Sequence, residues 1–147
     1  VGAFTAGGTV DAPVGRHPVD RKRMAVVESG RPAVTHYRIA ERFKAHTLLR
    51  VSLETGRTHQ IRVHMAYIRH PLVGDPVYGG RPILPKGASE RLRVALQGFS
   101  RQALHAARLG LVHPRSGEQM EWDTPLPADF ASLLEIMRSD CPEAYSE

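Results

Sequence analysis

Residues 53–64 carry the densest set of polar side chains that could do chemistry. A strand pattern ends there, Gly56 permits a tight turn, and Thr58 is of a type that caps helices. The unpaired N–H groups and the positive dipole end of a helix N-terminus attract anions. We therefore predict an anion site that suits an RNA backbone phosphate at this helix mouth. The polar residues around it are Arg57, Thr58, His59 and Gln60.

Arg62 needs separate treatment, because it lies on the border of an apolar stripe. Ile61, Met65 and Ile68 share one face of the predicted helix, and Arg62 lies about 60° from Met65. A buried guanidinium without a carboxylate costs several kcal/mol, so this position implies an acidic partner. A surface arginine whose stem covers the stripe is the alternative, and the spacing leaves both open.

The histidines lack the spacing of a metal site. His59 and His64 are five residues apart, about 140° around a helix, so they do not share a face as an i, i+4 ligand pair would. His70, His105 and His113 have no cysteine or carboxylate at ligand spacing. We therefore predict no metal, interpret His59 as an RNA or active-site contact, and interpret His64 as a packed core residue.

The charge balance favours a polyanionic partner. Twenty Lys and Arg oppose fifteen Asp and Glu, giving a net charge of +5 and a pI near 9.9, which suits RNA or DNA. Residues 15–23 have the composition of an exposed basic loop. Contact with a nucleic acid and an ordinary solvated loop both fit its side chains. The candidate contacts are Arg16, Arg21, Lys22 and Arg23.

The elements that must position these residues follow from periodicity. Residues 35–40 and 49–54 alternate with period two, and the short polar connection between them predicts an antiparallel hairpin. The inward side chains of its second strand are Leu49, Val51 and Leu53. Further elements are expected as a helix over 58–68, a loop over 74–82, a helix over 89–99, strands over 103–111 and 120–122 with a turn over 113–117, and a helix from Pro127. The pattern predicts an α+β fold, with a mixed or antiparallel sheet and flanking helices.

Size and composition suit one soluble domain or part of a larger one. The chain has 147 residues, 41% of them hydrophobic, and no apolar run near the about 18 residues of a membrane helix. Cys141 is the single cysteine, which fits a reducing cytoplasm and argues against a disulfide. Because Val1 stands where an initiator Met would, we expect a fragment, and we expect it to be monomeric.

Three ordered motifs resemble those of the RluA-type pseudouridine synthases. Residues 48–64 match the family pattern Thr-Gly-Arg-x-His-Gln-(Ile/Leu)-Arg-x-His, and residues 70–79 match His-Pro-(Ile/Leu)-x-Gly-Asp-x-x-Tyr-Gly. Residues 101–106 give the third match. The resemblance covers essentially the whole chain, and its details look most like family members that act on large-subunit ribosomal RNA.

The resemblance implies a cofactor-free isomerase that converts specific uridines of 23S-type ribosomal RNA to pseudouridine. In the family an aspartate attacks a uridine flipped into a pocket, and Arg62 matches the arginine that pairs with this aspartate. The His-Arg-Leu-Asp motif of that aspartate does not occur in the chain. We therefore expect residues 1–147 to be the C-terminal portion of the catalytic domain, without the nucleophile and the N-terminal RNA-binding domain, and inactive alone.

Three further interpretations accompany this one. Asp75 matches a different motif, and its Gly-Asp-Pro setting predicts a structural Asx-type turn. For the chain as a whole, the alternative is a non-catalytic RNA-binding module that keeps the basic scaffold. A hydrolase that uses the histidines is a distant third.

Overall fold

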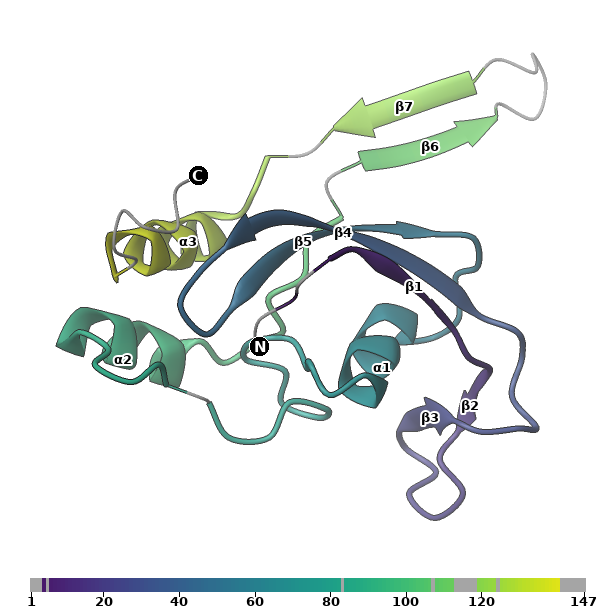
Figure 1. Cartoon of the computed structure of the whole chain (residues 1–147). Helices are drawn as coiled ribbons and strands as arrows, with labels where there is room; N and C mark the ends of the chain where they lie inside the picture. The colour runs from purple at the N-terminus through teal and green to yellow at the C-terminus, as the bar shows by residue number, and fades with distance from the viewer. Residues whose placement is uncertain are drawn as a thin grey trace.

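The computed structural model describes residue 4 and residues 6–82, 84–106, 108–112, 119–123 and 125–140. Within these ranges, antiparallel sheets and helices confirm the predicted α+β class, with the antiparallel arrangement in place of the mixed one (Figure 1). No helix of the described ranges is long and apolar enough to cross a membrane. The strands are β1 (Gly8–Asp11), β2 (Val14–Arg16), β3 (Met24–Val26), β4 (Val34–Arg42), β5 (Thr47–Leu53), β6 (Arg108–Val112) and β7 (Gln119–Asp123). The helices are α1 (Gln60–Tyr67), α2 (Glu90–Gly98) and α3 (Ala128–Asp140).

The main sheet has the strand order β1-β4-β5, so β4 is its central strand. β4 and β5 pair antiparallel, from Thr35 opposite Leu53 to Arg42 opposite Thr47, and the predicted hairpin is confirmed. A bulge lies between Ile39 and Glu41. Before this bulge, successive residues of β4 face opposite sides of the sheet, which separates Thr35 from its neighbour His36.

Two smaller hairpins complete the strands. β2 and β3 flank the basic loop, and the turn of this hairpin is exposed, as predicted. β6 and β7 pair over the predicted positions, but β6 starts at Arg108 instead of Ala103. The reason is that the Ala103 N–H donates to the Val73 carbonyl, 2.8 Å away, which ties this segment to the loop after α1. The predicted turn over 113–117 lies outside the described residues.

α1 packs on one face of the main sheet through the predicted stripe. Met65 is 1% exposed and packs with Ile61, Ile68 and Val10. Leu53 was predicted to face inward, but it is 46% exposed. It is the last residue of the edge strand β5, where packing against the helix has ended.

The start of α1 differs from its prediction. The N-cap residue is His59, in the left-handed conformation with φ 55° and no side-chain cap, so Thr58 lies outside the helix. The cause is a tight turn closed by Gln60, whose backbone N–H donates to the Arg57 carbonyl at 3.0 Å. The Gln60 Oε1 in turn accepts from the Arg57 N–H at 2.9 Å.

α2 and α3 form a second core with the end of the β4–β5 hairpin. Ser89 caps α2 by accepting from the Leu92 N–H at 3.1 Å, and α2 covers the predicted range. Pro127 immediately precedes α3, and its carbonyl accepts from the Ala131 N–H. The four predicted inward residues of α3 are all buried against Phe43, Leu92 and Leu96, and they are Phe130, Leu133, Leu134 and Met137.

Candidate active site

The guanidinium of Arg62 is buried and bound by one carboxylate. Its Nε donates to Asp75 Oδ2 at 2.8 Å and its Nη2 to Asp75 Oδ1 at 2.9 Å. The two side chains are 10% and 0% exposed. The prediction that this position needs an acidic partner is therefore confirmed, and the surface-arginine alternative is wrong. The partner in the structure is Asp75 of this chain, whereas the family resemblance implied an aspartate from outside it. Asp75 binds the edge of the Arg62 guanidinium formed by Nε and Nη2. The third nitrogen of Arg62, Nη1, has no hydrogen-bond acceptor among the described residues.

Asp75 holds this arginine from a loop that it also stabilises. Its Oδ1 accepts from the N–H groups of Val77 and Tyr78, each at 3.0 Å, so the predicted Asx-type turn is confirmed. Burial alone would raise the pKa of Asp75. The hydrogen bonds from Arg62, Tyr78 and Val77 outweigh burial, so the pKa of Asp75 stays below its ordinary value. The same contact raises the pKa of Arg62, and both groups are charged at neutral pH.

Tyr78 links α1 to the β2–β3 hairpin. Its hydroxyl accepts from the Met24 N–H at 3.0 Å and lies 3.0 Å from Nδ1 of His59. The guanidinium carbons of Arg23 and Arg62 each lie 5.0 Å from the centroid of its ring, within cation–π range. Tyr78 falls in the predicted loop and in the second family motif, and no role was predicted for it. Its position in that motif, three residues after Asp75, was the signal that could have found it.

Of the four basic residues predicted on the hairpin, Arg23 reaches the site. It is half-buried, and its Nε is a buried nitrogen without a hydrogen-bond partner among the described residues. Such unpaired buried donors are rare and point to an acceptor that binds there. Arg16 donates from Nη1 to the Arg21 carbonyl at 2.9 Å, and Arg21 and Lys22 are exposed in the turn.

Three of the four residues predicted around the helix mouth lie there. Thr58 and His59 are exposed, and half-buried Arg57 donates from Nε to the Pro32 carbonyl at 2.8 Å. Gln60 does not line the mouth, because it is 3% exposed and its side chain points into the protein. The prediction for Gln60 is corrected on this ground: its amide is used up in internal hydrogen bonds.

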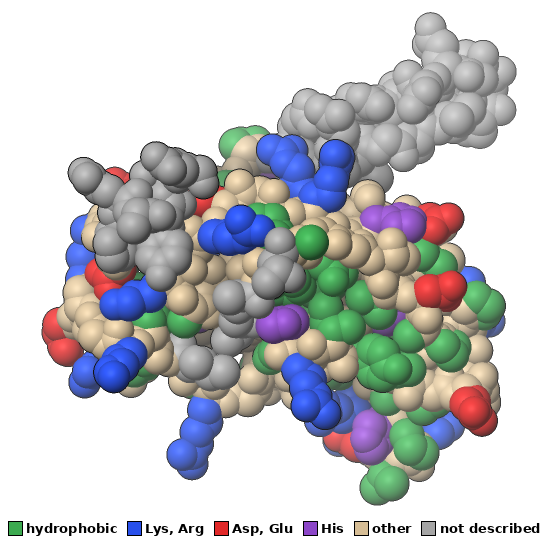
Figure 2. Space-filling view, viewed as in Figure 1, with side chains coloured by type: hydrophobic (Ala, Val, Ile, Leu, Met, Phe, Trp, Pro, Cys, Tyr) green, Lys and Arg blue, Asp and Glu red, His purple; other side chains and the backbone are tan. Residues whose placement is uncertain are grey.

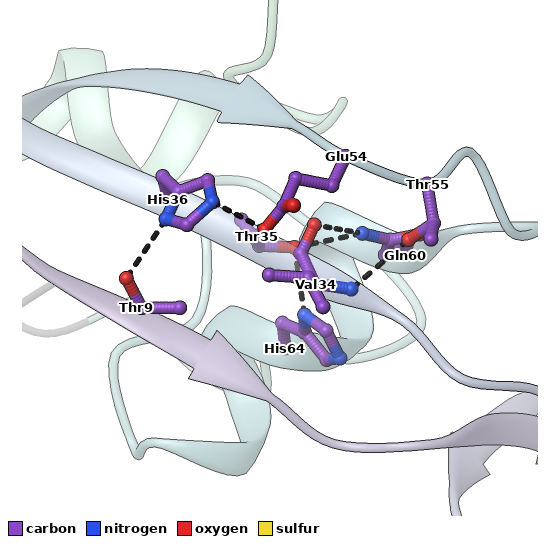
Figure 3. A network of polar contacts seen from close by, with 8 residues as sticks. All are labelled: Thr9, Val34, Thr35, His36, Glu54, Thr55, Gln60 and His64. Atoms are coloured by element: carbon purple, nitrogen blue, oxygen red, sulfur yellow. Dashed lines mark hydrogen bonds and ion pairs between the residues drawn. The ribbon is translucent and has the colours of Figure 1, made fainter.

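Gln60 belongs to a buried network that fixes α1 on β4 (Figure 3). Its Nε2 donates to the Val34 carbonyl and to Thr35 Oγ1, both at 3.0 Å, while its Oε1 accepts from Thr55 Oγ1 at 2.7 Å. Thr35 Oγ1 then lies 2.7 Å from Nδ1 of His64. The other ring nitrogen of His64, Nε2, lies 2.8 Å from the Ala12 carbonyl.

The network holds His64, which is fully buried as predicted, by both ring nitrogens. A carbonyl only accepts, so Nε2 donates to the Ala12 carbonyl, while Nδ1 is hydrogen-bonded to the Thr35 hydroxyl. Every member of the network has a hydrogen-bond partner, so the network holds helix α1 in one orientation. Its two helix residues, Gln60 and His64, lie two positions before and two positions after Arg62. The network therefore positions the arginine.

Replacing Thr35 by valine should lower the free energy of unfolding by about 2 kcal/mol, because buried polar groups of His64 and Gln60 lose a partner. Urea titration followed by circular dichroism measures this loss. The matched control is Thr9→Val, which removes an exposed hydroxyl on the adjacent strand β1. Equal effects of the two substitutions would show that the network does not hold the helix.

A hollow lies beside the loop that carries Asp75. It is lined by His46, Gly74, Phe99 and their neighbours. Burial lowers the pKa of His46 to about 4, so this imidazole is neutral at pH 7 and adds no charge to the hollow. The described residues contain no cluster of three or more His, Cys, Asp or Glu that could hold a metal ion, and we assign no cofactor or metal to the site.

Comparison with known proteins shows what the chain is similar to. Residues 2–67 match the family described as RNA pseudouridylate synthase. Two solved human proteins share the fold, RNA Pseudouridylate Synthase Domain Containing 4 and Domain Containing 1. The first has a TM-score of 0.69 and 25% identity, and the match covers 90% of this chain and 57% of that protein. The second has a TM-score of 0.64 and 28% identity, and the match covers 92% of this chain and 54% of that protein.

The whole chain is 63% identical to ribosomal large subunit pseudouridine synthase D of Escherichia coli (strain K12), of which it covers 45%. It is 60% identical over 140 residues to the Pseudomonas aeruginosa protein of the same name, covering 95% of this chain and 44% of that relative. These similarities confirm the predicted resemblance to the RNA pseudouridylate synthases. It spans less than half the length of these curated relatives.

Proposed function

We propose that this chain supplies the arginine-bearing part of an enzyme that isomerises uridine to pseudouridine in large-subunit ribosomal RNA. One observation carries the proposal: the buried guanidinium of Arg62 is bound by Asp75 along one edge, and its Nη1 has no acceptor among the described residues. A second carboxylate can bind there in the same plane, because a guanidinium presents five N–H donors in a rigid fork.

The second carboxylate is the aspartate nucleophile that the family resemblance implies, carried by polypeptide outside these 147 residues. An arginine at hydrogen-bonding distance keeps such a carboxylate ionised and fixes its direction of attack. Asp75 keeps the Arg62 side chain in place before the nucleophile arrives. The proposed reaction needs no cofactor, because it uses only protein side chains and the uridine.

The RNA contacts that we propose surround Tyr78. Its hydroxyl joins His59 to the β2–β3 hairpin, which brings together the helix mouth and the basic hairpin. The unpaired Nε of Arg23 offers a donor to a phosphate there. The proposed RNA-binding residues are Arg16, Arg21, Lys22, Arg23, Arg57, Thr58 and His59, with ribosomal RNA in the cytoplasm as partner and the protein acting as a monomer.

A tritium-release assay tests this function. Isomerisation replaces the C5–H bond of uridine by a bond from C5 to the ribose, so RNA labelled with tritium at C5 releases label into water. We expect no release by the 147-residue chain alone, and release by a polypeptide in which the aspartate-bearing segment precedes it. Turnover by the chain alone contradicts the assignment of the nucleophile. Absence of turnover by the longer polypeptide, with RNA binding retained, supports the non-catalytic alternative.

A further inference from the structure

Two arginines lie side by side on the face of the main sheet that α1 does not cover. Arg38 and Arg50 are directly opposite each other in the β4–β5 register, and both are exposed. Thr35 faces α1, so strand alternation places His36 and Arg38 on the other face. Among the described residues, neither arginine has an ion-pair or hydrogen-bond partner.

This arrangement costs stability, because like charges directly opposite each other in a sheet repel. Among the side chains that the structure describes, no carboxylate nearby offsets the repulsion. The adjacent strand β1 meets Arg38 near Gly7, which has no side chain. Glu54 lies four residues along the strand from Arg50, about 13 Å away and beyond a Debye length of about 8 Å, and it already binds His36 at 2.6 Å.

The other carboxylates near this face do not reach the arginine pair either. Asp11 pairs with Val34 at the far end of the sheet, four residues from Arg38. Glu41 accepts from Nε of Arg138 at 2.7 Å and is thereby neutralised by α3. Within the described part of the chain, the pair Arg38–Arg50 is therefore an uncompensated double positive charge. In Figure 2 the basic side chains are spread over this view of the molecule, and in Figure 1 the β6–β7 hairpin rises from the sheet on the side opposite α1.

We propose that Arg38 and Arg50 bind backbone phosphates of the RNA, as a second contact surface on the side of the sheet opposite α1. The proposal rests on the proposed function, since it takes RNA as the partner. A guanidinium pair suits phosphates, which accept from its N–H fork. A protein partner is disfavoured, because the described exposed large apolar side chains lie elsewhere. They are Val19, Leu53, Tyr67, Val77, Val94 and Leu126.

The test is the salt dependence of RNA binding by the 147-residue chain. A fluorescein-labelled single-stranded oligoribonucleotide of large-subunit sequence is titrated by anisotropy at several salt concentrations. Loss of two phosphate contacts in the double variant Arg38→Gln, Arg50→Gln should weaken binding and reduce the slope of log K against log salt by about 1.4. The matched control is Arg91→Gln, Arg93→Gln, which removes two exposed arginines from α2.

A second readout separates binding from folding. Removing the cross-strand repulsion should leave the melting temperature of the Arg38→Gln, Arg50→Gln variant equal to or above that of the parent, by up to about 3 °C. Weaker RNA binding together with undiminished stability supports the proposal. An unchanged salt slope, an equal change in the control, or no RNA binding by the parent chain overturns it. Binding is measured without turnover, so its failure is distinguishable from a failure of the isomerase assignment.

Discussion

Replacing Asp75 by asparagine is expected to lower the free energy of unfolding by about 3–5 kcal/mol at pH 7, because it leaves the buried guanidinium of Arg62 unpaired. The asparagine Oδ1 can still accept from the N–H groups of Val77 and Tyr78, so the loop turn is retained. The substitution thus removes the ion pair and little else. Urea unfolding followed by circular dichroism measures the loss.

The chain contains a matched control for this substitution. Arg101 binds Asp129 with the same two-bond geometry, at 2.8 and 2.7 Å, but both side chains are exposed to solvent. Solvent screens an exposed pair, so Asp129→Asn should cost far less than Asp75→Asn. Comparable losses from the two substitutions would mean that burial does not set the strength of the Arg62–Asp75 pair.

The difference in unfolding free energy between the parent and Asp75→Asn depends on pH with a definite sign. The pKa of Asp75 is lower in the folded state than its ordinary value near 3.8. Its stabilisation is therefore complete above the unfolded-state pKa and is lost as the pH falls through the folded-state pKa. The gap in unfolding free energy between the parent and Asp75→Asn should stay constant from pH 7 to 5 and narrow only below about pH 4.

The Arg62–Asp75 pair also shows what the sequence could and could not predict. Helical periodicity places Arg62 on the border of the apolar stripe, but it leaves open whether the side chain is buried against a carboxylate or lies on the surface. The identity of the carboxylate does not follow. Asp75 lies 13 residues later in a loop, and its turn was predictable from Gly-Asp-Pro alone. Its approach to Arg62 depends on how that loop packs against α1, which no local pattern encodes.

At the N-terminus of α1, residue type alone led to a wrong prediction. Thr58 is the better N-cap by type and Gln60 the more usual surface residue, yet His59 occupies the N-cap and Gln60 is buried. The reason is the hydrogen-bond network of Gln60, which includes Thr55 nearby and Val34 and Thr35 of β4, a strand far away in sequence. Elements with strong periodicity, such as the β4–β5 hairpin and α3, were predicted well because local pattern and burial agree.

Replacing Arg62 by lysine should lower kcat of the isomerase by about 10²–10³-fold while changing RNA affinity little. Lysine keeps the positive charge but has no planar fork, so it cannot bind Asp75 and a second carboxylate in one plane. The nucleophile would then lose its fixed orientation, whereas the RNA contacts proposed on Arg57 and the β2–β3 hairpin would stay.

The tritium-release assay in the aspartate-containing polypeptide measures this effect, with kcat and KM determined separately. Arg101→Lys serves as the control, since it makes the same substitution in the exposed pair with Asp129 and should leave kcat within about threefold. A merely structural role for Arg62 predicts that kcat recovers wherever the variant is folded, for example at low temperature. If the folded Arg62→Lys variant turns over at the parental rate, the guanidinium does not orient the nucleophile, and Arg62 contributes to stability alone.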